Sequence, residues 1–130
     1  MFRSKIFIMV ILVAGSLIFA QITTADGITK RVRFARGKSS ATLSGAVIRG
    51  DQDTYILGAS RRQNMTVKIT SLEKNAVFQI ETPGGDYLEN AGEMDDAMNW
   101  SGTLPESGDY RIIVGGTRGN ATYKLTVSIR

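Results

Sequence analysis

The chain has 130 residues, a formal net charge of +4, and neither cysteine nor histidine. This composition excludes disulfide bonds, Ser-His or Cys-His catalytic pairs and histidine-ligated metal sites. We therefore predict no catalytic residue, no metal ion and no cofactor, and a hydrolase is the least expected class of protein.

The charges are unevenly distributed along the chain. Residues 21–72 carry nine Lys or Arg against three Asp, a net charge of +6, and residues 73–110 carry one Lys against nine Asp or Glu, a net charge of −8. The first basic residues lie in and just after one strand-like segment, without the interleaved aromatic stripe of a typical nucleic-acid surface. We expect a solvated strand face there and no nucleic-acid partner. These residues are Lys30, Arg31, Arg33, Arg36 and Lys38.

The first residues have the layout of a secretory signal peptide. Arg3 and Lys5 precede an almost wholly apolar run at residues 6–20, and small residues stand at Ala20 and Ala25, where a signal peptidase could cut. This run is short against the roughly 20 residues of a spanning helix, which argues against a membrane anchor. We predict a signal peptide and short leader over residues 1–25, cleavage after Ala20 or Ala25, a periplasmic or secreted product, and no stable membrane insertion after cleavage.

Residues 26–130 alternate between apolar and polar residues with a period of two, and no helical pattern is visible. Strong turns follow at residues 83–86 (PGGD) and 105–108 (PESG), and the least regular and most acidic segment is 89–98. Eight or nine short strands predict one all-β domain, an antiparallel, jelly-roll-like β-sandwich over residues 26–130. The strands are expected near residues 31–34, 41–47, 54–59, 65–70, 78–81, from 100, 110–114 and 123–129.

The last two of these segments are joined by a glycine-rich loop. Tyr110, Ile112 and Val114 form one apolar face, and a second alternating run starts at Tyr123. Arg118 lies near the tip of the connecting loop. We predict that this region is the last hairpin of the sandwich.

Three landmarks resemble the bacterial pre-peptidase C-terminal-like β-sandwich domains. They are GDQDTY at residues 50–55, LPESGDY at 104–110 and YKLTV at 123–127. This resemblance implies the fold and says little about function.

A narrower resemblance covers nearly the whole chain after the leader. The runs FARGKSSA (34–41), SG (44–45), DTY (53–55) and NWSGTLP (99–105) are similar to those of the small periplasmic inhibitors of g-type (goose-type) lysozyme. This resemblance implies a stoichiometric protein inhibitor of a g-type lysozyme, not an enzyme. It leaves the oligomeric state open.

In that family, loops at one end of the sandwich are thought to enter the substrate cleft of the lysozyme, with an arginine before the last strand as a central contact. The match here is Arg118, flanked by Thr117 and Asn120, and Tyr55 matches an aromatic residue near the same end. Relatives commonly carry a longer loop with a second arginine, which is missing here because the loop passes directly from Asn120 to Ala121. The shorter loop implies a shorter reach and one charged contact fewer.

Each of these residues also has an ordinary structural interpretation. Arg118 could be a solvated loop arginine, and Tyr55 could pack in the core. Trp100, the only tryptophan, could be buried or could stack against a sugar ring.

Two other classes of function stay open at this point. The first is an envelope module that binds carbohydrate or calcium, through Trp100 and through carboxylates at residues 51 and 53 or 93–96. The second is a structural role in the envelope with Ile48 or Ile113 as contact residues.

Overall fold

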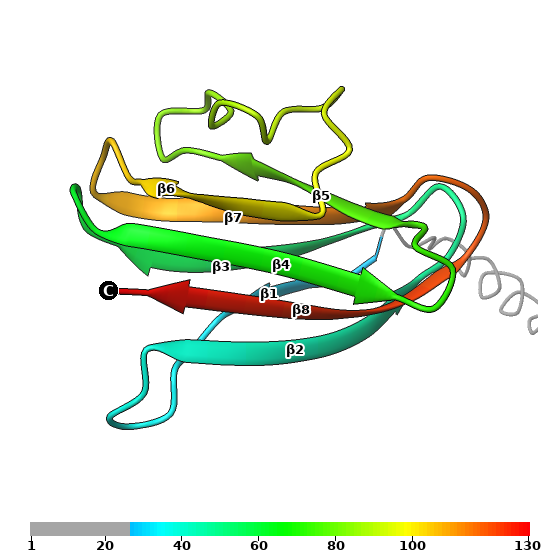
Figure 1. The fold of residues 1–130 in the computed structure, drawn as a ribbon, viewed down its shortest axis with the longest axis horizontal. Helices are drawn as coiled ribbons and strands as arrows, with labels where there is room; N and C mark the ends of the chain where they lie inside the picture. Colours follow the sequence, from blue (N-terminus) through cyan, green and yellow to red (C-terminus); the bar gives the residue numbers. More distant parts are fainter. Residues whose placement is uncertain (1–26) are drawn as a thin grey trace, which may run out of the picture.

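A computed structural model describes residues 27–130, and the predicted signal peptide lies outside the described residues. The described part contains eight β-strands and no helix, so it has no helix that could cross a membrane (Figure 1). The strands are β1 (Thr29–Arg31), β2 (Ser40–Val47), β3 (Gln52–Ala59), β4 (Asn64–Ser71), β5 (Ala76–Glu81), β6 (Asn99–Thr103), β7 (Gly108–Gly116) and β8 (Ala121–Ile129).

The strands form two four-stranded sheets packed face to face. One sheet has the order β1-β3-β7-β5 and the other the order β2-β8-β4-β6. All pairs are antiparallel except β1 with β3, where Thr29 lies opposite Thr54 in a parallel register. The prediction of an all-β sandwich with eight or nine strands is therefore confirmed, with one parallel pair added at an edge.

The prediction that the last two strands form a hairpin is wrong. β7 pairs with β3 and β5, whereas β8 pairs with β2 and β4 in the other sheet. Residues 117–120 therefore carry the chain from one sheet to the other at the end of the sandwich (Figure 1). Alternation shows that each segment has one buried face, but neighbours in sequence need not be neighbours in a sheet.

The core lies between the two sheets and consists of the inward-facing residues of the strands. β7 contributes Tyr110, Ile112 and Val114, all fully buried, and β8 faces them with Leu125 and Val127. Burial of one such side chain contributes roughly 1.5–3 kcal/mol. Because the domain has no cysteine, this packing and the backbone hydrogen bonds hold the sandwich together.

The acidic segment between β5 and β6 covers one edge of the first sheet. The backbone N–H of Phe78 donates to the carbonyl of Ala97, and that of Ile80 donates to the carbonyl of Ala91, each at 2.9 Å. Leu88 is buried with these two alanines. Through these contacts the segment pairs with β5, which would otherwise present an open edge.

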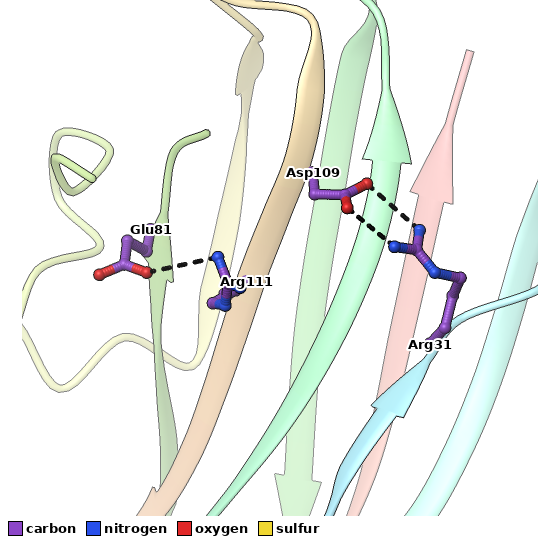
Figure 2. A network of polar contacts seen from close by, with 4 residues as sticks. All are labelled: Arg31, Glu81, Asp109 and Arg111. Carbon is purple, nitrogen blue, oxygen red and sulfur yellow. Dashed lines mark hydrogen bonds and ion pairs between the residues drawn. The ribbon is translucent and has the colours of Figure 1, made fainter. Parts of the chain in front are cut away.

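Two ion pairs lie on the outer face of the first sheet, and one of them joins the basic residues 21–72 to the acidic residues 73–110 (Figure 2). Arg31 on β1 binds Asp109 on β7 through two hydrogen bonds of 2.8 and 3.2 Å, and Arg111 lies 4.0 Å from Glu81. The guanidinium of Arg31 meets Asp109 over Gly58, where a Cβ would lie in ordinary van der Waals contact, 3.5 Å from the Asp109 Oδ1. The Arg31 side chain lowers the pKa of the Asp109 carboxyl.

Candidate partner-binding site

Three loops meet at one end of the sandwich, on the right in Figure 1. They are residues 48–51 between β2 and β3, residues 72–75 between β4 and β5, and residues 117–120 between β7 and β8. The strand registers bring them together, since Val47 pairs with Ala121, and Ala76 pairs with Gly116. We call these three segments the loop end.

Asn75 holds the loop that carries Arg118. Its side chain is 2 % exposed, and its Nδ2 donates to the carbonyl oxygens of Arg118 at 3.2 Å and Asn120 at 2.9 Å. The carbonyl of Asn75 accepts a hydrogen bond from the backbone N–H of Thr117 at 2.9 Å. The Ser71 hydroxyl in turn accepts from the backbone N–H of Asn75 at 3.0 Å. The buried side-chain amide of Asn75 therefore holds the backbone of residues 117–120 in place.

Asn120 joins this loop to the neighbouring loop. Its Oδ1 accepts a hydrogen bond of 2.7 Å from the backbone N–H of Arg49. The two loops therefore form one connected surface, and the amide of Asn120 is used within the protein.

Arg118 lies exposed at the tip of residues 117–120. Its Nη2 donates to the carbonyl of Glu73 at 2.9 Å, which orients the guanidinium toward the loop after β4. A guanidinium has five N–H donors, and within residues 27–130 this is the only hydrogen bond that the Arg118 side chain makes. Its remaining donors are available to a partner.

Two glycines give this loop its shape. Gly119 has a φ of +66°, in the left-handed region that favours glycine. A Cβ at Gly116 would lie 2.9 Å from the carbonyl oxygen of Gly119, so a larger residue would push the loop open.

Tyr55 belongs to the core, as its structural interpretation predicted. Its side chain is 1 % exposed, and its hydroxyl lies 2.6 Å from that of Tyr123. Tyr123 donates to the carboxylate of Asp53 at 2.6 Å, so Tyr55 must be the donor to Tyr123. Asp53 also accepts from the backbone N–H of Ile28 at 3.0 Å. This buried chain of three side chains ties the start of β1 to both sheets beneath the loop end.

Three exposed apolar residues surround the site. Leu72 is 97 % exposed, Ile48 is 64 % exposed and Ile28 is 49 % exposed, and all three lie at or beside the loop end. Ile113 is half-buried on β7. Leu72 and Asn75 carried no functional signal in the sequence, because a leucine or an asparagine in a turn is unremarkable without knowledge of its neighbours.

The residues of the carbohydrate and calcium hypotheses have contacts within the protein. Trp100 is partly buried against the core, and its Nε1 donates to the carbonyl of Glu89 at 2.9 Å. Asp53 accepts two hydrogen bonds, and Asp95 accepts one of 2.7 Å from the backbone N–H of Gly92. Across residues 27–130 there is no group of three or more acidic, cysteine or histidine side chains that could hold a metal ion.

The fold is a small β-sandwich with three connected loops at one end. A pre-peptidase C-terminal domain of a collagenase from Bacillus anthracis has this fold, with a TM-score of 0.62 over 82 % of this chain and all of that chain, at 17 % identity. No protein-family model matches the sequence.

The sequence identity is higher to inhibitors of g-type lysozyme. The inhibitor of g-type lysozyme of Escherichia coli K12 is 32 % identical over 123 residues, which covers 88 % of this chain and 91 % of that protein. The crystal structure of PliG from Aeromonas hydrophila, a periplasmic inhibitor of g-type lysozyme, is 37 % identical, with a TM-score of 0.68 over 82 % of this chain and all of that chain. The chain therefore belongs to the family of inhibitors of g-type lysozyme.

Proposed function

We propose that this protein binds a g-type lysozyme through its loop end and blocks the substrate cleft, with Arg118 entering the cleft. The observation that carries this proposal is an exposed guanidinium on a loop whose backbone is already held by Asn75 and Asn120. Such a loop loses little conformational entropy on binding, so more of its contact energy appears as affinity.

The chemistry of the cleft suits this arginine. Glycoside hydrolases generally carry catalytic carboxylates, and a guanidinium binds a carboxylate through two parallel charge-assisted hydrogen bonds. The bond from Arg118 to the carbonyl of Glu73 leaves the other N–H groups free for this contact. Inhibition then requires occupation of the cleft and no chemical step by the inhibitor.

The other predicted contact residues take different roles in this proposal. The exposed side chain of Thr117 lies beside Arg118 and would contact the enzyme directly. Asn120 acts through the loop by holding Arg49, and the buried Tyr55 supports the loop end from the core. Ile48 and Leu72 add apolar area around the arginine.

We further propose that the protein is exported to the periplasm. The basic, apolar and small residues of the first 25 positions support a cleaved signal peptide. The description of the related PliG as a periplasmic inhibitor supports the same location.

The test is a cell-wall clearing assay with a purified g-type lysozyme. The protein should inhibit the enzyme at near-stoichiometric ratios and compete with substrate, and full lysozyme activity at a large molar excess of the protein would refute the proposal. Arg118→Ala should weaken inhibition at least tenfold, about 1.4 kcal/mol. The matched control is Arg61→Ala, because Arg61 is an exposed arginine on the β3–β4 turn at the opposite end. Equal inhibition by both variants would remove Arg118 from the mechanism.

A further inference from the structure

The strand β6 has an open edge. It pairs with β4 on one side and is the last strand of its sheet. The hydrogen bonds from Ile69 N–H to the Met98 carbonyl and from Leu104 N–H to the Gln63 carbonyl mark the bonded positions of this antiparallel pair. Bonded and non-bonded positions alternate, so the backbone N–H and C=O groups of Ser101 point away from β4, as do those of the residue two positions on, Thr103.

The side chains of these two residues do not cover the edge. The hydroxyl of Ser101 lies 2.9 Å from that of Thr66, and the hydroxyl of Thr103 donates to Asn64 at 2.9 Å, both toward β4. The outward backbone groups of Ser101 and Thr103 have no partner within the part of the chain that the structure describes.

Natural proteins usually protect such edges with lysine, proline, shortness or a covering segment. Here the edge of β5 is covered by residues 91 and 97. The edge strand β1 is protected by its shortness and its charge, since it has three residues and two of them are Lys30 and Arg31. The edge strand β2 is flanked by Lys38 and Arg49. The strand β6 contains no lysine, arginine or proline.

A groove of about 560 Å³ runs along this edge. Its far wall comes from the loop after β5, which lies beside β6 above the sheets in Figure 1 and contributes Tyr87 and Glu89. Trp100 connects the two walls, because its Nε1 binds the Glu89 carbonyl while its ring lies against Gly102. A Cβ at Gly102 would lie 2.9 Å from the indole, so glycine is needed for this ring position.

The charge of the groove is negative. Asp86, Glu89 and Glu106 line it, and no lysine or arginine does. An extended peptide backbone can add to a strand edge by main-chain hydrogen bonds, while alternate side chains enter the flanking groove. Carboxylates and a tryptophan beside that edge favour lysine or arginine side chains in those positions.

We propose that this groove binds an extended, basic segment of another protein, which adds to β6 as a further strand. The β6–β7 turn and the loop with Arg118 lie at opposite ends of β7, so this site is separate from the loop end. The protein can therefore hold a second partner while its loop end stays free.

The probe is a short synthetic peptide of alternating lysine and valine, acetylated and amidated at its ends. Binding should change the fluorescence of Trp100, which is the only tryptophan of the chain, and should shift the amide NMR signals of Ser101 and Thr103. The same peptide with alternate backbone amides N-methylated should bind at least tenfold more weakly, because it cannot pair with the strand.

Ser101→Pro is the sharpest variant. The N–H of Ser101 points away from β4, so proline removes an outward donor and leaves the pairing with β4 intact. It should lower peptide affinity at least tenfold, whereas the matched control Ser101→Ala, which also loses the hydroxyl, should bind as the parent does. Glu89→Gln with Glu106→Gln should weaken the lysine peptide and leave a neutral alternating peptide unaffected.

Three results would overturn the proposal. They are no shift of Ser101 and Thr103 at millimolar peptide, equal affinity for the peptide and its N-methylated form, or perturbation of Trp100 by an N-acetylglucosamine trimer and not by the peptide. The last result would assign the groove to glycans. The N-methylated peptide keeps the test valid if Ser101→Pro does not fold.

Discussion

The Nδ2 of Asn75 donates a partly buried hydrogen bond of 2.9 Å to the carbonyl of Asn120, across 45 residues of sequence. Together with the bond from the same atom to the Arg118 carbonyl, it fixes both sides of Gly119. One side chain just before β5 therefore holds the loop on which the proposed inhibition depends.

We predict that Asn75→Ala destabilises the domain and weakens inhibition together. The substitution leaves the carbonyls of Arg118 and Asn120 without their donor, which should lower the free energy of unfolding by about 1–3 kcal/mol. Urea denaturation measures the first effect, and the clearing assay measures the second. The control is Asn99→Ala, because Asn99 is exposed and its side chain makes no hydrogen bond within residues 27–130. Equal stability of the two variants would contradict the role given to Asn75.

The buried hydrogen-bond chain from Tyr55 through Tyr123 to Asp53 predicts that loss of the two tyrosine hydroxyls destabilises the domain unequally. Tyr123→Phe removes the donor to Asp53 and the acceptor of Tyr55, so it should lower the free energy of unfolding by about 1.5–3 kcal/mol. Tyr55→Phe removes only the terminal donor and leaves the bond from Tyr123 to Asp53, so its effect should be smaller. Thermal or urea unfolding of both variants measures the difference. A larger loss for Tyr55→Phe would contradict the central position of Tyr123 between Tyr55 and Asp53.

Alkaline pH should destabilise the domain through its buried tyrosines. Burial raises the pKa of Tyr55, Tyr110 and Tyr123 above the ordinary value of 10.0, and for Tyr123 the hydrogen bond to Asp53 raises the pKa further. Since the folded state holds these phenols protonated, their contribution to stability is complete below pH 10 and is lost as the pH rises above it. Phenolate absorbance should appear together with unfolding. Ionisation of Tyr55, Tyr110 and Tyr123 near pH 10 in a still folded protein would contradict this prediction.

Acid pH should reveal the pair of Arg31 and Asp109 in Figure 2. The hydrogen bond from Arg31 lowers the pKa of Asp109 below 3.8, so this exposed pair adds stability above that pH and loses it as the pH falls. NMR titration of the Asp109 carboxyl should show the lowered pKa, and Arg31→Gln should raise it toward 3.8. Lys30→Gln, one residue away, should leave it unchanged. An unaltered Asp109 titration in Arg31→Gln would mean that the pair does not form in solution. Because both side chains are exposed, the change in stability should be small.

Much of the fold could be predicted from local patterns. Strict alternation marked the strands around Met65, Tyr110 and Tyr123, because a half-buried strand needs an apolar residue at every second position. Glycines at 116 and 119 marked the turning loop, because Gly119 is left-handed and Gly116 lies too close to the Gly119 carbonyl for a side chain. The family could be recognised for the same reason, since its motifs lie in continuous runs of sequence.

Contacts between distant segments could not be predicted in this way. Alternation assigned a buried face to β7 and to β8, but the partner strands, which lie in different sheets, depend on the packing of the whole domain. The same packing buries Tyr55, brings Asn75 within hydrogen-bond distance of the loop and leaves one edge of β6 unpaired within residues 27–130. The alternation of apolar and polar residues predicts which side chains are buried, because burial depends on the chemistry of each side chain. The neighbours of each side chain are determined only by the packing of the two sheets against one another.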